Sequence, residues 1–301
     1  MMFFPFINNN ESKETKNILN IYILKIFVFC LMILGLGFFV GSTNGVNISS
    51  FVVLNESLYV LCVCFFILIL CFTLGCFPFH TWIPILNENN NENNLFSYFL
   101  VEKNILTWSL MLVLQVLLPK LSGYYGDIIV DCVKSFAIMT TFYGVLVACH
   151  QTNLKLILSF FSIGNAGFIL LYAVTPALPE MNEQFLLYLL FYSLILTLNI
   201  HLINLNKNEI KDLKDLSFLF QKRPKFAFVL FTSLFLFFSS IITSGMILNF
   251  KFFMTAYSEK LYFELIFIVC VNLCGGAFLI SKILVIFKRF AKFKKKVILV
   301  K

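Results

Sequence analysis

The sequence predicts an all-α, polytopic membrane protein with about eight transmembrane helices, one of them broken. Of its 301 residues, 60% are hydrophobic and 13% are charged, whereas roughly a quarter of the residues of a soluble domain carry charge. The mean hydropathy is +0.91 and the chain holds 39 phenylalanines. This balance excludes a disordered chain, a disulfide-rich secreted module and an ordinary cytosolic enzyme.

Long apolar runs recur along the whole chain, separated by polar or glycine- and proline-containing segments. Each run should be a membrane helix, because hydrocarbon offers no partners for free backbone groups and each is long enough to cross a core about 30 Å thick. The runs are 18–41, 52–79, 95–118, 127–149, 155–175, 184–206, 225–257 and 261–288. Residues 1–17 form a polar N-terminal segment, and residues 289–301 form a basic tail.

The seventh run, 225–257, is roughly ten residues longer than one straight crossing needs. Its middle, Ser239 to Gly245, is rich in small and hydroxylated residues, which tolerate an interruption of the helix. We therefore expect a broken helix in this run.

The basic residues are distributed unevenly between the predicted loops. With alternating crossings, one side of the membrane receives 16 lysines and arginines, whereas the other receives only Lys120 and Lys260. The positive-inside rule then places both termini in the mitochondrial matrix or the bacterial cytoplasm. Lysine makes up 21 of the 23 basic residues, a bias that AT-rich codons produce and that points to an organellar genome. No cleavable signal is evident, so the first run should remain as a span.

Five lysines lie inside apolar runs, where an ammonium group costs about 2.5–3.5 kcal/mol at the bilayer centre on insertion scales. Lys25 and Lys282 lie near a basic end and can extend to the interface. Two interpretations remain open for Lys103 and Lys134: each side chain extends to the membrane interface, or it faces a polar interior of the protein. Lys251 lies beyond the predicted break, where free backbone groups can hold charge and water, so we expect a functional role for it.

Neither cysteines nor histidines form a recognisable site. The nine cysteines lie in or beside apolar runs, and none is grouped with histidine at zinc or iron–sulfur spacing, so we interpret them as packing residues. The three histidines lie at the basic-side ends of their runs: His80, His150 and His201. Two interpretations remain open for them, hydrogen-bonded residues at helix ends or groups through which protons enter. We expect no catalytic residue, no redox centre or covalent chemistry, no cofactor and no metal in this chain.

Four segments, in order along the chain, carry motif-like patterns. FPFHTWIP at 77–84 resembles a PFHxWxP motif, and Lys103 follows its histidine by 23 residues. The segment 151–168 resembles QxNxK…SSIxHxGY, and 215–224 (DLSFLFQKRP) resembles DLSGLFxKRP. NFKF at 249–252 occupies the position of a GKF motif. Together these patterns resemble the antiporter-like membrane subunits of respiratory complex I (proton-translocating NADH:ubiquinone oxidoreductase), and within them the subunit 2 type.

The resemblance implies a part of the antiporter-like fold and a proton-translocating subunit of an enzyme whose redox chemistry takes place in other chains. It implies that Lys103 is the central relay lysine and that Lys251 lies near an exit half-channel. We add Lys134, Glu102 and His150 as possible members of the proton path. Adjacent residues on a helix point about 100° apart, so Glu102 and Lys103 should not pair face to face.

The sequence departs from the family pattern at key positions. Thr73 replaces a lysine seven residues before the motif histidine, Asn165 replaces a histidine, and Thr243 replaces the proline of the broken helix. The five leading helices of the family core, including the one that bears a glutamate, and the last helix have no counterpart. Either the lineage has lost these helices or a second polypeptide supplies them. Because half a core would leave polar helix faces against lipid, we expect a C-terminal portion of a split subunit, whose N-terminal helices come from a separate polypeptide.

Three functions remain open at this point. The chain could pump protons with the partner's glutamate, it could have become a structural scaffold of the membrane arm, or it could belong to a free-standing cation/proton antiporter. The expected partners are other membrane-arm subunits of complex I, the polypeptide with the missing helices, and lipids such as cardiolipin, but no nucleic acid. The expected location is the mitochondrial inner membrane.

Overall fold

A computed structural model describes residues 12–43, 51–88, 103–121, 123–174, 179–205, 212–213, 215–239 and 262–299. Over these ranges the backbone is almost entirely helical, and the only β-type pairings are two isolated bridges, Thr43 with Val53 and Asn153 with Asp212. The prediction of an all-α fold is confirmed.

The described helices follow the order of the apolar runs. Their bounds are α1 Ser12–Ser42, α2 Glu56–Leu74, α3 Trp82–Glu88, α5 Lys103–Leu117, the 3-10 turn η2 Leu118–Lys120, α6 Gly123–His150, α7 Leu154–Ala173, α8 Pro179–Leu205, α9 Asp215–Lys222, α10 Pro224–Phe238 and α12 Tyr262–Leu299.

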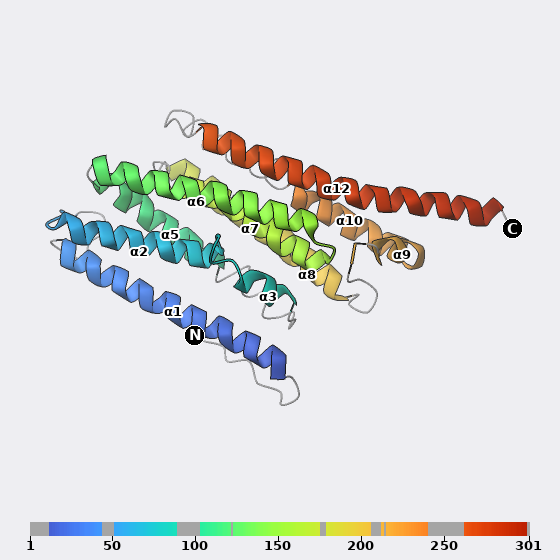
Figure 1. Ribbon diagram of the computed structural model, residues 1–301, viewed down its shortest axis with the longest axis horizontal. Coiled ribbons are helices and arrows are strands. Elements are labelled where there is room, and N and C mark those ends of the chain that lie inside the picture. Colours follow the sequence, from blue (N-terminus) through green and yellow to red (C-terminus); the bar gives the residue numbers. More distant parts are fainter. Residues whose placement is uncertain are drawn as a thin grey trace.

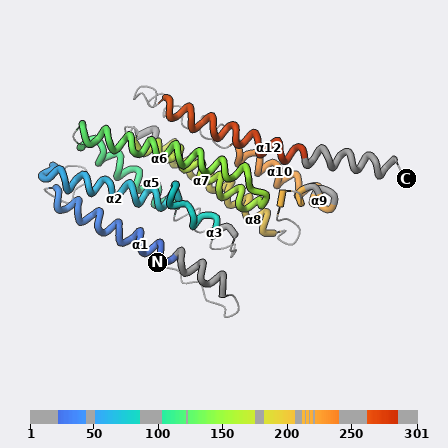
Figure 2. The backbone as a smooth tube through the Cα atoms, viewed as in Figure 1, coloured from blue at the N-terminus to red at the C-terminus, as the bar shows by residue number. Residues whose placement is uncertain are grey.

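The long helices lie side by side in an elongated bundle (Figures 1 and 2). α1 and α2 form one edge, α12 lies along the opposite edge, and α6 and α7 pack against each other between them. α7 is the centre of the bundle, because 18 of its 20 residues are buried. A helix that is apolar all round belongs in such an interior position.

Six of the described helices are long and apolar enough to cross a membrane. They cover Tyr22–Ser42, Glu56–Leu74, Gly123–His150, Leu154–Ala173, Asn182–Leu205 and Tyr262–Val285. α5 and α10 are shorter, with 15 residues each. The chain is therefore a multi-pass membrane protein. α10 ends at Phe238. The predicted break, Ser239 to Gly245, follows it and, apart from Ser239, lies outside the described residues.

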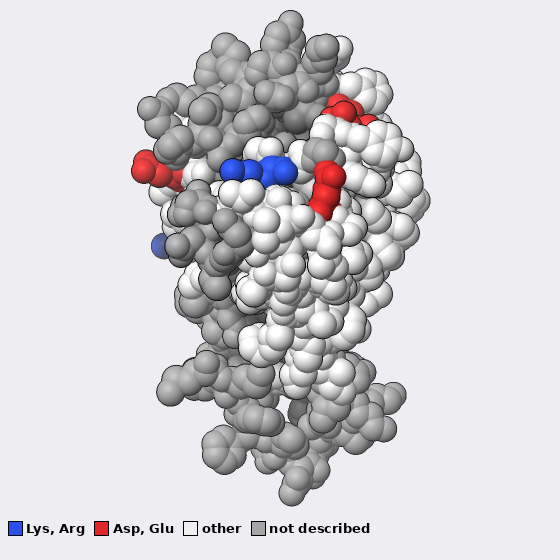
Figure 3. All heavy atoms as spheres, turned by 90° about the vertical axis from the view of Figure 1, so that its left-hand side faces the viewer, with Lys and Arg blue, Asp and Glu red and all other residues white. Residues whose placement is uncertain are grey.

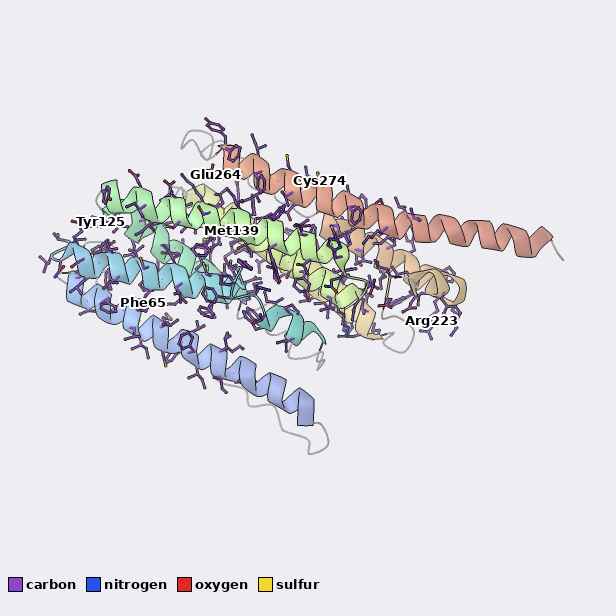
Figure 4. The ribbon with its side chains drawn as sticks, in the orientation of Figure 1. Phe65, Tyr125, Met139, Arg223, Glu264 and Cys274 are labelled. Atoms are coloured by element: carbon purple, nitrogen blue, oxygen red, sulfur yellow. The ribbon has the colours of Figure 1, made fainter. Side chains whose placement is uncertain are left out.

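The two ends of the bundle differ in the elements that they carry. Arg223 lies near one end, with α3 and α9, whereas Tyr125 at the start of α6 and Glu264 at the start of α12 lie toward the other (Figure 4). Figure 3 views this second end, where lysine and arginine atoms cover little of the described surface. We call it the lysine-poor end.

Glycines bring α6 and α7 into backbone contact. A Cβ atom at Gly144 would lie 2.3 Å from the backbone nitrogen of Gly164 and 2.8 Å from the carbonyl oxygen of Phe160. A Cβ at Gly167 would lie 2.4 Å from the carbonyl oxygen of Ala137. Small residues allow this close approach of membrane helices, whose association depends on packing rather than on exclusion of water.

Candidate functional site

The FPFHTWIP segment forms a tight turn at the end of α2. Gly75 adopts a left-handed conformation with φ of 69°, and the N–H of Cys76 donates to the Cys71 carbonyl at 2.9 Å. The N–H of Phe77 donates to the Thr140 hydroxyl on α6 at 3.3 Å. The Trp82 indole N–H donates back to the Phe72 carbonyl at 3.2 Å. These bonds hold the turn against α2 and α6.

His80 lies in this turn among aromatic rings. Its ring centroid lies 4.6 Å from that of Tyr143 and 5.8 Å from that of Phe77, and its Nδ1 atom is buried without a hydrogen-bond partner. Burial lowers the pKa of His80, because it disfavours the charged imidazolium, and the backbone of Pro78 partly opposes this. The neutral imidazole is therefore favoured at neutral pH.

Lys103, the first residue of α5, is buried with 8% of its surface exposed. Its ammonium group lies close enough to the Cys76 thiol, at the turn after α2, for the two groups to interact electrostatically. Cys76 is fully buried and also approaches the side chains of Cys71 and Thr140. The structure thus buries Lys103 beside a polar, titratable group, whereas the sequence alone gave Cys76 only a packing role.

Thr73, which takes the place of a lysine in the motif pattern, is buried on α2. Its hydroxyl donates to the Leu70 carbonyl within the same helix at 2.9 Å. The hydroxyl is thus satisfied within α2, and unlike a lysine at this position the side chain carries no charge.

The other predicted members of the path lie elsewhere. Lys134 forms an ion pair with Asp131, one turn earlier on α6, with a nitrogen–oxygen distance of 2.9 Å; the Asp131 side chain is 71% exposed. His150 is exposed at the end of α6. The structure does not gather Lys134 and His150 around Lys103. Glu102 and Lys251 lie outside the described residues.

Lys282 on α12 is tied to the end of α6. Its ammonium group donates a hydrogen bond to the Cys149 carbonyl and lies 4.7 Å from the centroid of the Phe278 ring. A cation that binds the last carbonyls of a helix also complements the negative end of the helix dipole. The structure therefore gives Lys282 a helix-capping contact at the end of α6.

We expect Lys282→Met to lower the free energy of unfolding by about 1.5–3 kcal/mol, because it removes a hydrogen bond from a charged donor and leaves a carbonyl unpaired. Lys282→Arg retains a cationic donor and serves as the matched control. Thermal unfolding of the purified protein in detergent measures the difference. Equal transition temperatures for wild type and Lys282→Met would contradict the capping role.

Several buried polar side chains lie between α5, α7 and α8 and were not predicted as site residues, apart from Asn165, which the sequence marks as a replaced histidine. The Asn104 amide donates to the Ser193 hydroxyl at 2.8 Å, and the Tyr188 hydroxyl donates to the Asn165 amide oxygen at 2.9 Å. Polar residues in membrane helices usually face the protein interior or a water-filled cavity and mark functional sites. Their spacing alone did not reveal which helices they join.

A match to a sequence-family model shows which family this chain belongs to. The family model described as NADH:quinone oxidoreductase/Mrp antiporter, TM matches residues 2–275. The chain belongs to this family. The predicted resemblance to the antiporter-like subunits, and to the subunit 2 type, is confirmed.

Curated relatives in the NADH:quinone oxidoreductase/Mrp antiporter family have low sequence identity to this chain but match long segments of it. Over 240 residues the chain is 26% identical to NADH-quinone oxidoreductase subunit N of Bdellovibrio bacteriovorus, with 74% of this chain and 48% of the relative covered. Over 190 residues it is 27% identical to the Rickettsia bellii protein of the same name, with 61% of this chain and 40% of the relative covered. The chain thus spans about half the length of the curated relatives it matches, or less.

Solved structures of multi-subunit membrane complexes share the fold. The chain matches the archaeal membrane-bound sulfane sulfur reductase with a TM-score of 0.75 at 14% identity, covering 91% of this chain and 57% of that one. It matches respiratory complex I from Thermus thermophilus with a TM-score of 0.65 at 17% identity, covering 88% and 58%. For the Mrp complex from Dietzia the TM-score is 0.70 at 16% identity, covering 91% and 50%.

Proposed function

We propose that this chain is a membrane-arm subunit of respiratory complex I that contributes to proton translocation coupled to NADH oxidation and ubiquinone reduction. The observation that carries the proposal is the buried Lys103, which lies beside the FPFHTWIP turn in a chain of this family. A lysine enclosed by protein at membrane depth can take up and release a proton when a neighbouring charge changes. Redox chemistry would occur in other subunits, and this chain would need no cofactor.

Lys103→Met tests the proposal, because methionine keeps much of the side-chain length but cannot carry a proton. In vesicles reconstituted with the complete complex, we expect fewer protons translocated per NADH oxidised. Lys120→Met, at the exposed end of η2, is the matched control and should leave the ratio unchanged. Lys251→Met extends the test to the second predicted lysine.

An unchanged ratio in the Lys103→Met and Lys251→Met complexes, at normal NADH oxidation and normal assembly, would refute a pumping role. It would instead support the alternative that this subunit is a scaffold of the membrane arm. Migration of the solubilised chain on a native gel away from NADH dehydrogenase activity would support a free-standing antiporter.

We also propose the mitochondrial inner membrane as the location, with both termini in the matrix. The uneven distribution of lysine between loops and the lysine-rich, arginine-poor composition support this. Protease treatment of mitoplasts should then leave epitopes at both termini intact, whereas it should cleave an epitope inserted at the lysine-poor end.

The partners proposed are other membrane-arm subunits, lipids such as cardiolipin, and a separate polypeptide that supplies the remaining helices of the fold. The coverage of relatives, 48% for the Bdellovibrio protein, supports the last of these. Mass spectrometry of the isolated complex should find this chain near its sequence mass of 34.7 kDa, together with a second chain that carries the remaining helices. A single longer chain would contradict a split subunit.

A further inference from the structure

Basic side chains gather where α9 meets α10, at the end of the bundle where Arg223 lies (Figure 4). Lys222 is the last residue of α9, Lys225 lies in the first turn of α10, and Arg223 is the single residue between the two helices. All three residues are exposed. Three positive charges therefore lie within four residues, and we call these three residues the basic junction.

Backbone hydrogen bonds on both sides of Arg223 hold the basic junction in place. The Arg223 N–H donates to the Leu219 carbonyl in α9 at 2.8 Å, and the Arg223 carbonyl accepts from the N–H of Ala227 in α10 at 3.0 Å. Pro224 then begins α10, with a backbone angle that suits the first turn of a helix. The three charges are therefore carried by two joined helix ends and not by a loose loop.

α9 has one side against the bundle and one side at the surface. Leu216 and Leu219 are buried, whereas Phe218 is 49% exposed. The Lys222 ammonium group lies 4.7 Å from the centroid of the Phe218 ring. Aromatic rings are enriched where a membrane protein meets the lipid headgroups, and short helices with one apolar side lie in that layer. This arrangement is typical of a helix at the membrane surface.

α10 also has two different faces. Its buried face packs inside the bundle and consists of Ala227, Leu230, Ser233, Leu234, Phe237 and Phe238. The most exposed apolar side chains on α10 are Phe228 (62%), Val229 (49%), Phe235 (47%) and Leu236 (47%). Lys225 precedes Phe228 by three residues and Val229 by four, so these side chains share one face of the helix. The exposed face of α10 therefore begins with a cation and continues as an apolar stripe.

The length of this stripe matches one leaflet of a bilayer. From Phe228 to Leu236 the helix rises about 12 Å, whereas half of the hydrocarbon core measures about 15 Å. A positive charge at the surface, followed by an aromatic ring and then aliphatic side chains, complements a phospholipid with an anionic headgroup and apolar acyl chains. A protein helix packed on the same stripe would not need the cations above it.

The charge of the basic junction is not cancelled along α9. The first residue of α9, Asp215, lies about 10 Å from Lys222 along the helix axis, and its carboxylate accepts a hydrogen bond from the N–H of Asp212 at 2.9 Å. Arginine can hold a phosphate through two parallel N–H donors, and lysine adds a compact charge beside it. Basic residues next to a membrane helix attract anionic lipids of the leaflet on their side.

We infer that the basic junction and the exposed face of α10 bind one anionic phospholipid, with its phosphate at Lys222, Arg223 and Lys225 and its acyl chains along Phe228 and the stripe below. The inference gives a place to the lipid partner named under the proposed function and rests on that part of it. It does not depend on proton translocation. A zwitterionic phospholipid carries no net negative charge and binds this site more weakly.

Photolabelling of the intact complex tests the site. The complex is reconstituted in phosphatidylcholine vesicles with a small fraction of photoreactive phosphatidylglycerol, and labelling of the Lys225–Phe238 segment is quantified by mass spectrometry. Lys222→Gln, Arg223→Gln and Lys225→Gln are combined in one variant. At about fivefold in affinity for each charge, we expect labelling to fall on the order of 100-fold. Photoreactive phosphatidylcholine should label the wild-type segment weakly.

Two further variants control for charge and folding. Lys294→Gln, Lys295→Gln and Lys296→Gln together remove three charges from the basic tail and should leave labelling of α10 unchanged. Lys222→Arg with Lys225→Arg retains the charge of the basic junction and should retain the labelling. An equal loss in the tail variant would show attraction to the whole surface in place of a site, and would overturn the inference.

Other outcomes would overturn the site in different ways. Equal labelling by the two photoreactive lipids would mean that α10 meets only bulk lipid. Unchanged labelling in the glutamine variant of the basic junction would mean that these cations do not hold the phosphate. An electron cryomicroscopy map of the intact complex with another subunit on the exposed face of α10 would assign that face to a protein partner.

Proton counts on the same reconstituted complex separate this inference from the pumping role. If phosphatidylglycerol labels α10 selectively while Lys103→Met leaves the protons per NADH unchanged, the pumping role fails and the lipid site stands. If Lys103→Met lowers the ratio while labelling shows no preference for the anionic lipid, the lipid site fails and the pumping role stands.

Discussion

Gly144→Ala should sharply reduce the amount of folded protein in the membrane. The new Cβ would lie 2.3 Å from the backbone nitrogen and 2.7 Å from the Cα of Gly164, and backbone atoms cannot rotate away as a side chain can. α6 and α7 would have to separate along much of their contact. Overpacking costs about 1–3 kcal/mol in ordinary cores, and a larger loss is expected here because α7 is the central helix.

The measurement is the yield of chain incorporated into the membrane complex, together with its thermal transition. Gly126→Ala is the matched control on the same helix, because its Cβ would meet only Leu121 at 3.8 Å. Wild-type incorporation and stability of Gly144→Ala would show that α6 and α7 do not approach as closely as the structure indicates.

Gly75→Ala should destabilise the turn that precedes Lys103 and lower proton translocation without touching a titratable group. Its φ of 69° costs a residue with a side chain about 1–2 kcal/mol. The new Cβ would also lie 2.2 Å from Cδ1 of Ile83. Because the turn holds His80 and positions Cys76, we expect both the thermal transition and the number of protons per NADH to fall.

A second substitution separates the two causes. Ile83→Ala removes the side-chain atom that the new Cβ would meet. The double variant Gly75→Ala/Ile83→Ala should therefore be free of the steric clash but should retain the backbone strain at position 75. The double variant should therefore lose less than the sum of the two single losses. Gly41→Ala, which meets no atom within 4 Å, is the control. Strict additivity would show that the clash does not occur in the native protein.

The fold class was predictable because composition and run length alone determine it: a chain with so much apolar surface can satisfy its backbone in lipid only as helices. The choice of Lys103 as a candidate site residue was also possible from the sequence. An ammonium group in an apolar run is rare and costly, and the spacing of Lys103 from His80 matched a known pattern. The capping contact of Lys282 was not, because it depends on where α12 meets the end of α6.

The buried polar contacts between α5, α7 and α8 were hidden from the sequence for a different reason. Asn104, Tyr188 and Gln115 lie on separate helices, and each is a common residue in its own run. Only the packing of α5 and α8 against α7 brings them together inside the bundle. Asn165 was noticed only as a departure from a pattern, yet its amide oxygen accepts the hydrogen bond from Tyr188.

The contact of Gly144 with Gly164 has a consequence for how the chain would hold an electrochemical gradient. Where a single methyl group does not fit between two backbones, a file of solvent does not fit either. Ions therefore cannot pass along the α6–α7 boundary, and the glycine contact closes this boundary to water and ions in addition to packing the two helices. Any passage through this chain must therefore lie away from this boundary.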